Sequence, residues 1–188
     1  MVRSEPLARF PMSVIDAQSC AVLLIDFQAR LVPAIDGASA VVVNAVRLVE
    51  AAKLIGVPMA FTEQNPKGLG ATVPELRPDP ALVIGKMTFD ACQTPAVLER
   101  LPPGRDVVIA GCEAHVCVLQ TALGLIERGR RAFVVNDAIG SRRAESKERA
   151  IARMERCGAE IVTTEMVVFE WLGSADHPRF KEAVRLIK

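Results

Sequence analysis

The feature that most constrains the fold of this chain is a regular alternation of short apolar runs with longer helical stretches. Most of the short runs are apolar at every position, which is typical of strands that helices cover on both faces. Six such runs are predicted as strands, at residues 21–25, 58–62, 81–84, 106–110, 132–136 and 160–163.

Helical periodicity fills the intervals between these runs. Residues 38–55 place Val42, Ala45 and Val49 on one face, and Gly56 follows as a stop signal. Residues 115–128 are apolar nearly all round, which predicts a buried helix. Further helices are expected at 95–100, at 144–156 and after Pro178.

Six strands interleaved with helices predict an α/β fold, a three-layer α/β/α sandwich of Rossmann-like type with a central six-stranded parallel sheet. We expect one domain over residues 1–188, in which residues 1–19 form an irregular N-terminal leader that contains Pro6 and Pro11.

Composition excludes several classes of partner and location. The net charge is +1 and aromatic residues make up 4% of the chain, which argues against nucleic-acid or anionic-membrane binding. Neither a signal peptide nor an apolar run of membrane-spanning length is found. Five cysteines without a C-x-x-C motif favour free thiols in a reducing compartment, so we expect a cytoplasmic protein.

Three reactive side chains lie at or shortly after predicted strand ends. Asp26 directly follows the first strand, Lys86 follows the third, and Cys117 lies six residues after Gly111, which closes the fourth. Each alone has an ordinary explanation, as a cap, a solvent-directed lysine or a small core residue. Because ligands bind beyond the carboxyl ends of parallel strands, we expect the three to meet in one pocket.

The three groups also suit one another chemically. A thiol becomes a strong nucleophile on losing its proton, and a helix N-terminus or a nearby ammonium lowers its pKa. A carboxylate within reach can accept that proton and later return it to a leaving group. His115 and His177 are the only histidines, and we interpret His115 as a structural or pocket-lining residue.

Three segments of the sequence resemble the signatures of the isochorismatase-like cysteine hydrolases. They are VLLIDFQ at 22–28, GKMTFDAC at 85–92 and IAGCEAHVCVLQTAL at 109–123. The segments 62–70, 127–143 and 169–188 are most similar to the isochorismatase-domain-containing subgroup, whose substrates are poorly defined.

The resemblance implies a role for each matching residue. Asp26 would be the general acid/base, Lys86 would pair with Asp26 and the thiolate, and Cys117 would attack the substrate carbonyl. A non-proline cis peptide would join Cys112 to Glu113, and the backbone N–H groups of Glu113 and Cys117 would form the oxyanion hole.

Nicotinamidases of the same family carry a metal site with histidines after the second strand. The corresponding segment here, TEQNPKGLG at 62–70, contains no histidine. Because a zinc site needs about three protein ligands, we expect no catalytic metal and no cofactor, and nicotinamide is disfavoured as a substrate.

Five residues are weaker candidates for substrate contacts. Phe27 and Phe89 could line the pocket or pack as ordinary core aromatics. Gln64 and Asn65 follow the second strand and could bind substrate or serve the turn. His115 could face the same pocket.

The sequence therefore predicts a metal-independent cysteine hydrolase that acts on a small amide, imide or related C–N substrate through a covalent thioester. The alternatives are an isochorismatase-type vinyl ether hydrolase and a noncatalytic scaffold or interaction protein. A phosphoaspartate phosphatase is disfavoured because that class needs a second Asp two residues after Asp26, where this chain has Gln28. Asp137 is interpreted as a turn or helix-entry residue. We expect a small-molecule substrate and a homo-oligomer, a dimer or a tetramer.

Overall fold

The computed structural model describes residues 14–188. Residues 1–13 of the expected leader lie outside this range. The remainder of the leader has no regular helix or strand. Ile15 is buried, its N–H donates to Glu170 Oε2 at 2.6 Å, and a turn in which Ser19 N–H donates to Asp16 O at 3.1 Å leads into the first strand.

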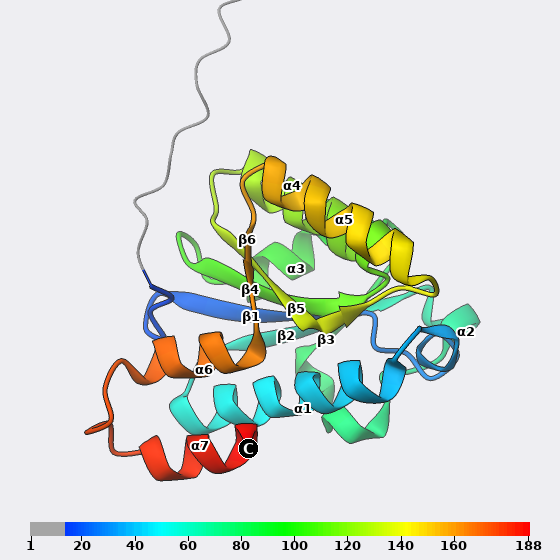
Figure 1. Cartoon of the computed structure of the whole chain (residues 1–188). Coiled ribbons are helices and arrows are strands. Elements are labelled where there is room, and N and C mark those ends of the chain that lie inside the picture. Colours follow the sequence, from blue (N-terminus) through cyan, green and yellow to red (C-terminus); the bar gives the residue numbers. More distant parts are fainter. Residues whose placement is uncertain (1–13) are drawn as a thin grey trace, which may run out of the picture.

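A six-stranded sheet with every strand parallel to its neighbours forms the middle layer, so the predicted α/β architecture is confirmed (Figure 1). The strand order is β3-β2-β1-β4-β5-β6. The strands are β1 (Cys20–Ile25), β2 (Met59–Gln64), β3 (Val83–Lys86), β4 (Asp106–Cys112), β5 (Ala132–Gly140) and β6 (Glu160–Val162).

This strand order reverses direction once, between β1 and β4. The chain steps from β1 to β2 and β3 at one edge, then returns to place β4 on the other side of β1. The β1–β4 pairing runs from Cys20 opposite Asp106 to Ile25 opposite Gly111. In open α/β sheets such a switch point, at the carboxyl ends of the strands, is where ligands bind.

Helices cover both faces of the sheet, α1, α6 and α7 on one side and α3, α4 and α5 on the other (Figure 1). Alternate residues of β1 belong to two separate hydrophobic cores, one on each face of the sheet. Val22 and Leu24 pack toward α1, and Leu23 and Ile25 pack toward α4. The helices are α1 (Ala38–Ile55), α2 (Pro66–Leu69), α3 (Pro95–Arg100), α4 (Leu119–Glu127), α5 (Ala144–Arg156), α6 (Thr164–Leu172) and α7 (Phe180–Ile187). Short 3-10 turns are Val32–Ala34, Pro74–Leu76, Pro80–Leu82 and Ala91–Gln93.

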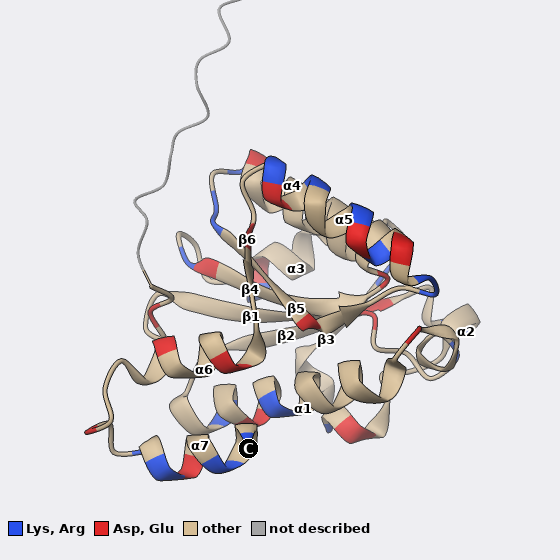
Figure 2. Ribbon diagram, viewed as in Figure 1, with Lys and Arg blue, Asp and Glu red and all other residues tan. Residues whose placement is uncertain are grey.

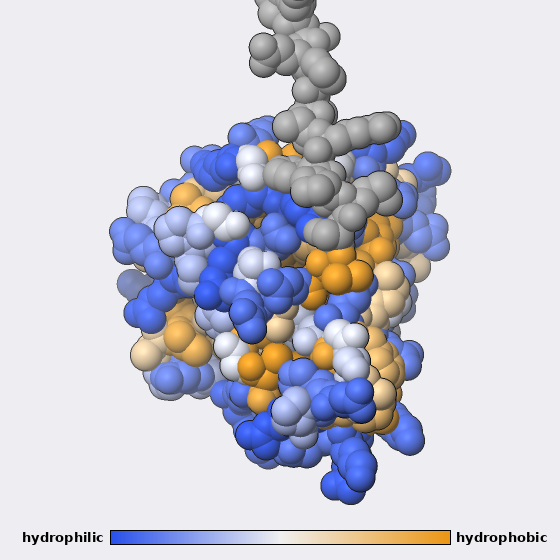
Figure 3. All heavy atoms as spheres, turned by 90° about the vertical axis from the view of Figure 1, so that its left-hand side faces the viewer, coloured by the Kyte–Doolittle hydropathy of each residue, from blue (hydrophilic) through white to orange (hydrophobic). Residues whose placement is uncertain are grey.

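The surface of the described chain is largely polar. Charged residues of both signs lie along α5 and α7 (Figure 2), and small apolar areas interrupt a mainly hydrophilic face (Figure 3). Within residues 14–188, the helices all fall short of the length and apolar character that crossing a membrane requires.

Several element boundaries differ from the sequence prediction. Strands β2, β3, β4 and β5 continue further than predicted, so Gln64 and Lys86 are strand residues and do not follow their strands. The predicted helix 115–128 begins instead as a π-helical turn, η5 (Ala114–Val118), and becomes α-helical at Leu119. Helix α6 was not predicted, because its apolar run follows β6 after a single residue.

Candidate active site

Asp26 lies at the switch point directly after β1. Its backbone has φ 55°, a left-handed conformation that Asp tolerates better than most residues. The carboxylate is fully buried and holds two hydrogen bonds. Thr62 Oγ1 donates to Oδ1 at 2.7 Å, and Lys86 Nζ donates to Oδ2 at 2.7 Å.

Lys86 ends β3 and brings a buried ammonium to the same point. Besides Asp26, Nζ donates to Gln64 Oε1 at 2.9 Å and to the carbonyl oxygen of Thr88 at 3.3 Å. The three donors of the ammonium thus match three acceptors. These additional hydrogen bonds matter because the attraction between two buried charges does not by itself offset the free energy lost when both leave water.

Cys117 completes the cluster from the π-helical turn after β4. Its thiol interacts with both the Asp26 carboxylate and the Lys86 ammonium. Burial and the charge of Asp26 raise the pKa of Cys117 to about 12, although Lys86 acts in the opposite direction. The helix N-terminus and the lysine had predicted a lowered pKa for this thiol, but burial has the larger effect.

A cis peptide bond joins Cys112 to Glu113, at the position that the resemblance implied. The Glu113 carboxylate turns away from the three reactive groups, since it accepts from Arg142 Nε at 3.0 Å and from the Arg142 backbone N–H at 3.1 Å. Cys112 belongs to the core on the α1 side of the sheet, whereas Cys117 belongs to the core on the α4 side. This arrangement does not favour a disulfide between them.

Gln64 serves the lysine directly. Its Oε1 accepts from Lys86, and its Nε2 donates to the Met87 carbonyl at 2.8 Å. The Gln28 side chain in turn forms two hydrogen bonds with the Gln64 backbone. Gln28 Oε1 accepts from the Gln64 N–H at 2.8 Å, and Gln28 Nε2 donates to the Gln64 carbonyl oxygen at 3.0 Å. The site thus has supporting residues, Thr62 and Gln28, that sequence reasoning missed.

The other substrate-contact candidates are spread over different surroundings. Phe27 is packed in the core beneath α1, on the opposite side of the sheet from the Cys117 cluster, which matches its ordinary core interpretation. Phe89 is 51% exposed on the loop after β3. Asn65 is exposed and lines a cavity of about 580 Å³ together with Lys86, Met87 and Thr94.

His115 faces α5, away from the Asp26–Lys86 pair. Its Nδ1 lies 2.9 Å from Ser141 Oγ and 3.8 Å from Glu113 Oε2. It lines a cavity of about 400 Å³ with Arg142, Arg143 and Ser146. It is thus a pocket-lining residue on the other flank of the cysteine.

Reactive residues outside the Asp26–Lys86–Cys117 cluster have structural roles or are buried. Asp137 lies within β5, so its interpretation as a turn or helix-entry residue was wrong. Its Oδ1 accepts from the N–H and hydroxyl of Thr164, at 2.8 and 3.0 Å, and so helps to cap α6. Burial raises the pKa of Cys20 to about 11 and of Cys92 to about 12. Over residues 14–188, no group of three or more His, Cys, Asp and Glu side chains is arranged to hold a metal ion.

Comparison with known proteins sets this geometry in a family. The model of the isochorismatase domain matches residues 20–166, which include all three reactive residues. The chain belongs to the isochorismatase-domain family. Isochorismatase domain-containing protein 2 of Xenopus laevis is 38% identical over 173 residues, which cover 90% of this chain and 84% of the relative.

Solved structures agree with this assignment. The MAR1 ribonuclease of Caenorhabditis elegans superposes with a TM-score of 0.86 and 36% identity, over 93% of this chain and 92% of that one. The YcaC gene product of Escherichia coli, described as an octameric hydrolase of unknown specificity, gives 0.81 and 28%, over 95% and 89%. Membership of the family supports the assignment of a hydrolase.

Proposed function

We propose that this chain is a metal-independent cysteine hydrolase that cleaves a C–N bond in a small amide, imide or carbamoyl compound. The observation that carries the proposal is the buried contact of one carboxylate, one ammonium and one thiol at the switch point. The carboxylate and the ammonium alone would form an ion pair. The thiol adds a nucleophile beside a base, which is the arrangement that covalent catalysis requires.

The reaction begins with proton transfer from Cys117 to Asp26. The raised pKa of the thiol means that the resting site holds the proton on sulfur. Transfer to the adjacent carboxylate generates the thiolate as the substrate arrives, while Lys86 stabilises the sulfur anion. The sulfur then forms a bond to the substrate carbonyl carbon, and the C=O electron pair moves to oxygen.

Collapse of that intermediate breaks the C–N bond. Asp26 gives its proton to the departing nitrogen, and a thioester remains on Cys117. A water molecule then attacks the thioester carbon and gives a proton to Asp26. The C–S bond breaks to release the acid, and Asp26 returns the proton to the Cys117 sulfur. Backbone N–H groups of Glu113 and Cys117 are the proposed donors to the oxyanion, each worth about 3–4 kcal/mol of barrier in comparable sites.

Substrate entry is proposed at the cavity that Asn65, Lys86, Met87 and Thr94 line. Its volume of about 580 Å³ lies within the usual range for small-molecule sites. Phe89, exposed on the same loop, is proposed to contact the substrate as it enters.

The experiment is a panel of primary amides, cyclic imides, carbamoyl compounds and isochorismate, with release of ammonia and acid followed by mass spectrometry. Cys117→Ala is expected to abolish turnover, and intact mass should reveal an acyl adduct on the wild-type protein. Cys157→Ala, at a half-buried thiol outside the site, is the matched control and should keep full activity. Undiminished C–N cleavage by Cys117→Ala would refute the covalent mechanism.

Vinyl ether hydrolysis is the alternative that the panel distinguishes, because it does not need the thiol as a nucleophile. Isochorismate turnover that survives Cys117→Ala would favour it. A chain that turns over no member of the panel, and whose Cys117 shows no reaction beyond that of an ordinary buried thiol, would favour the noncatalytic scaffold.

A third candidate is phosphodiester cleavage, since the C. elegans relative is named a ribonuclease. The observation in its favour is a cavity of about 390 Å³ lined by His115, Arg143, Arg149 and Arg153. Single-stranded RNA cleavage that is lost in His115→Gln but retained in Cys117→Ala would support it. One carboxylate, Glu145, also lines this cavity, and the cavity holds none of the three groups Asp26, Lys86 and Cys117, so we prefer the C–N reaction.

We further propose that the protein is a cytoplasmic homo-oligomer. The E. coli relative is described as an octamer, which supports self-association. Sedimentation analysis of the purified chain gives the number of subunits, and a single monomeric species at micromolar concentration would contradict the proposal.

A further inference from the structure

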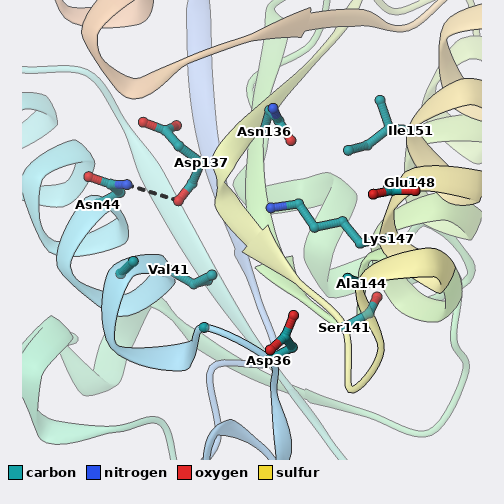
Figure 4. Close-up of a pocket in the computed structure, with 12 residues that line it drawn as sticks. Asp36, Val41, Asn44, Asn136, Asp137, Ser141, Ala144, Lys147, Glu148 and Ile151 are labelled. Carbon is teal, nitrogen blue, oxygen red and sulfur yellow. Dashed lines mark hydrogen bonds between the residues drawn. The ribbon is translucent and has the colours of Figure 1, made fainter.

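A further cavity, separate from the Asp26–Lys86–Cys117 cluster, opens along the second half of β5 between α1 and α5 (Figure 4). It has a volume of about 510 Å³, within the range of small-molecule sites. Its lining comes from the segment before α1, from α1 itself, from the end of β5 and from the first turns of α5.

Lys147 is the central side chain of this cavity. It extends from α5 toward β5, with its ammonium inside the hollow (Figure 4). Within the described chain the ammonium has no hydrogen bond and no ion pair. Burial lowers the pKa of Lys147, while the carboxylates of Asp137 and Asp36 favour its charged form. The N–H groups of this half-buried ammonium are therefore available to donate to a ligand in the cavity.

Asp36 supplies the opposite charge. Its carboxylate points toward the cavity from the segment before α1 (Figure 4), and no hydrogen bond or ion pair to that carboxylate is found among residues 14–188. The backbone of Asp36 is fixed, because its N–H donates to the Ser141 carbonyl at 3.0 Å. The Asn136 side chain adds a further polar group without a partner in the described chain.

The remaining acidic groups narrow the ligand class. Asp137 Oδ1 accepts both bonds from Thr164, which fixes this carboxylate at the wall of the cavity, and Glu148 lies at the exposed rim on α5. A purely anionic ligand would meet repulsion from these two carboxylates and from Asp36, and a purely cationic one would meet repulsion from Lys147. A ligand that carries both charges complements both sides of the cavity.

We propose that this cavity binds a small zwitterion of the α-amino acid class, with its carboxylate on Lys147 and its ammonium on Asp36. The Asn136 amide is placed to hydrogen-bond a polar substituent of the ligand. The site runs along the second half of β5, where the strand no longer pairs with β6 and its edge is open to a ligand.

The test is calorimetric titration of the full chain with a panel of free α-amino acids. Acetate and propionate serve as anion-only probes, and ethylamine as a cation-only probe. At least one amino acid is expected to bind with one site per chain, about tenfold or more tighter than any single-charge probe. Lys147→Gln and Asp36→Asn are each expected to weaken that binding by about tenfold or more.

Two control variants make the same changes in charge at exposed positions outside the cavity. Lys181→Gln on α7 and Asp176→Asn before it should leave binding unchanged. The proposal is overturned if no amino acid binds at millimolar concentration, if acetate or ethylamine binds as tightly as the amino acids, or if the Lys147 variant binds like the wild type. Circular dichroism of each variant shows whether the fold is retained, and a crystal soaked with the tightest amino acid locates it.

Discussion

A lysine ammonium with no exposed surface remains charged only where protein acceptors replace its water shell. Lys86 has three acceptors, and the side-chain amide of Gln64 is the only neutral side chain among them. The second amide atom of Gln64 is anchored on Met87. Gln64 therefore fixes where the ammonium lies relative to Asp26 and Cys117, and acts on the reaction through Lys86.

Gln64→Met keeps the size of the side chain and removes both hydrogen bonds. We expect kcat to fall by about 10- to 100-fold with KM nearly unchanged, and stability to fall by about 1–3 kcal/mol because a buried charged donor loses a partner. Steady-state kinetics and urea unfolding measure the two effects. A raised KM with kcat unchanged would instead show that Gln64 contacts the substrate. Exposed Gln18→Met is the control.

Thr62 offers a second test of the same principle from the carboxylate side. Thr62→Val has almost the same shape but leaves Asp26 Oδ1 without its 2.7 Å donor. We expect a loss of about 1–3 kcal/mol in unfolding free energy and at least about a tenfold loss of activity, as is usual when a buried charged group loses a hydrogen bond. Thr62→Ser retains the hydroxyl and should recover most of the activity, whereas equal activity of the Val and Ser variants would contradict the role.

Sequence reasoning at this scale could identify Asp26, Lys86 and Cys117, because reactive residue types at strand ends form a recognisable pattern. It could not identify Gln28 or Thr62. Both are ordinary polar residues within or beside strands, and their importance arises only when β1, β2 and β3 lie side by side. The pKa of Cys117 was misjudged for another reason. The apolar residues 115–128 predicted burial, but whether burial outweighs the helix and Lys86 is decided only in the packed structure.

At the scale of elements, the closest approach in the site is that of β4 to β1. A Cβ atom at Gly111 would lie 2.5 Å from the Ile25 carbonyl oxygen and 2.6 Å from Ile25 Cβ, and Gly111 has φ 156°. The Asp26 backbone and the Cys112–Glu113 peptide follow immediately on the two strands. Glycine at this position thus permits the two strand ends to converge.

Gly111→Ala is accordingly expected to force β4 and β1 apart and to lower the free energy of unfolding by about 3 kcal/mol or more, as overpacking of a core does. Denaturant unfolding followed by circular dichroism measures the loss. Gly104→Ala is the control: Gly104 has φ 72°, but nothing lies within 4 Å of its Cβ position, so its cost should be about 1 kcal/mol. Equal costs for the two variants would show that the contact with Ile25 is not limiting.

The order and type of most elements could be predicted from periodicity, because strands covered on both sides and amphipathic helices leave clear patterns. The ends of β2 and β3 could not, since their last residues are polar or glycine and are held by pairing with each other. The end of β5 could not, because Asn136 and Asp137 interrupt its apolar run before Ala138–Gly140, which pair with β4. Helix α6 was missed because its start depends on capping by Thr163 and on Asp137 from β5. The π-helical turn at Cys117 likewise depends on its contacts with β4 and α5.

At the scale of the whole molecule, the two-sided burial that creates the site also withdraws four thiols from water. Burial raises the pKa from its usual 9.0 to about 11 for Cys20 and to about 12 for Cys92, Cys112 and Cys117. In the unfolded chain these thiols ionise near pH 9, whereas the folded protein keeps their protons. Between pH 9 and about 12, therefore, the unfolded state binds fewer protons than the folded state.

Linkage then fixes the sign: the stabilisation is fully present below pH 9 and is lost as the pH rises toward 12, by up to about 1.4 kcal/mol per pH unit for each thiol. Urea unfolding at pH 8, 9 and 10 should show a falling midpoint, and because the chain has no Tyr, phenol ionisation cannot cause it. Cys92→Ala should make the decline shallower, since it removes one of the four buried thiols. Cys157→Ala changes a thiol outside this group and should leave the dependence of the midpoint on pH unchanged. If neither variant alters that dependence, other groups, such as lysines, cause the loss of stability at alkaline pH.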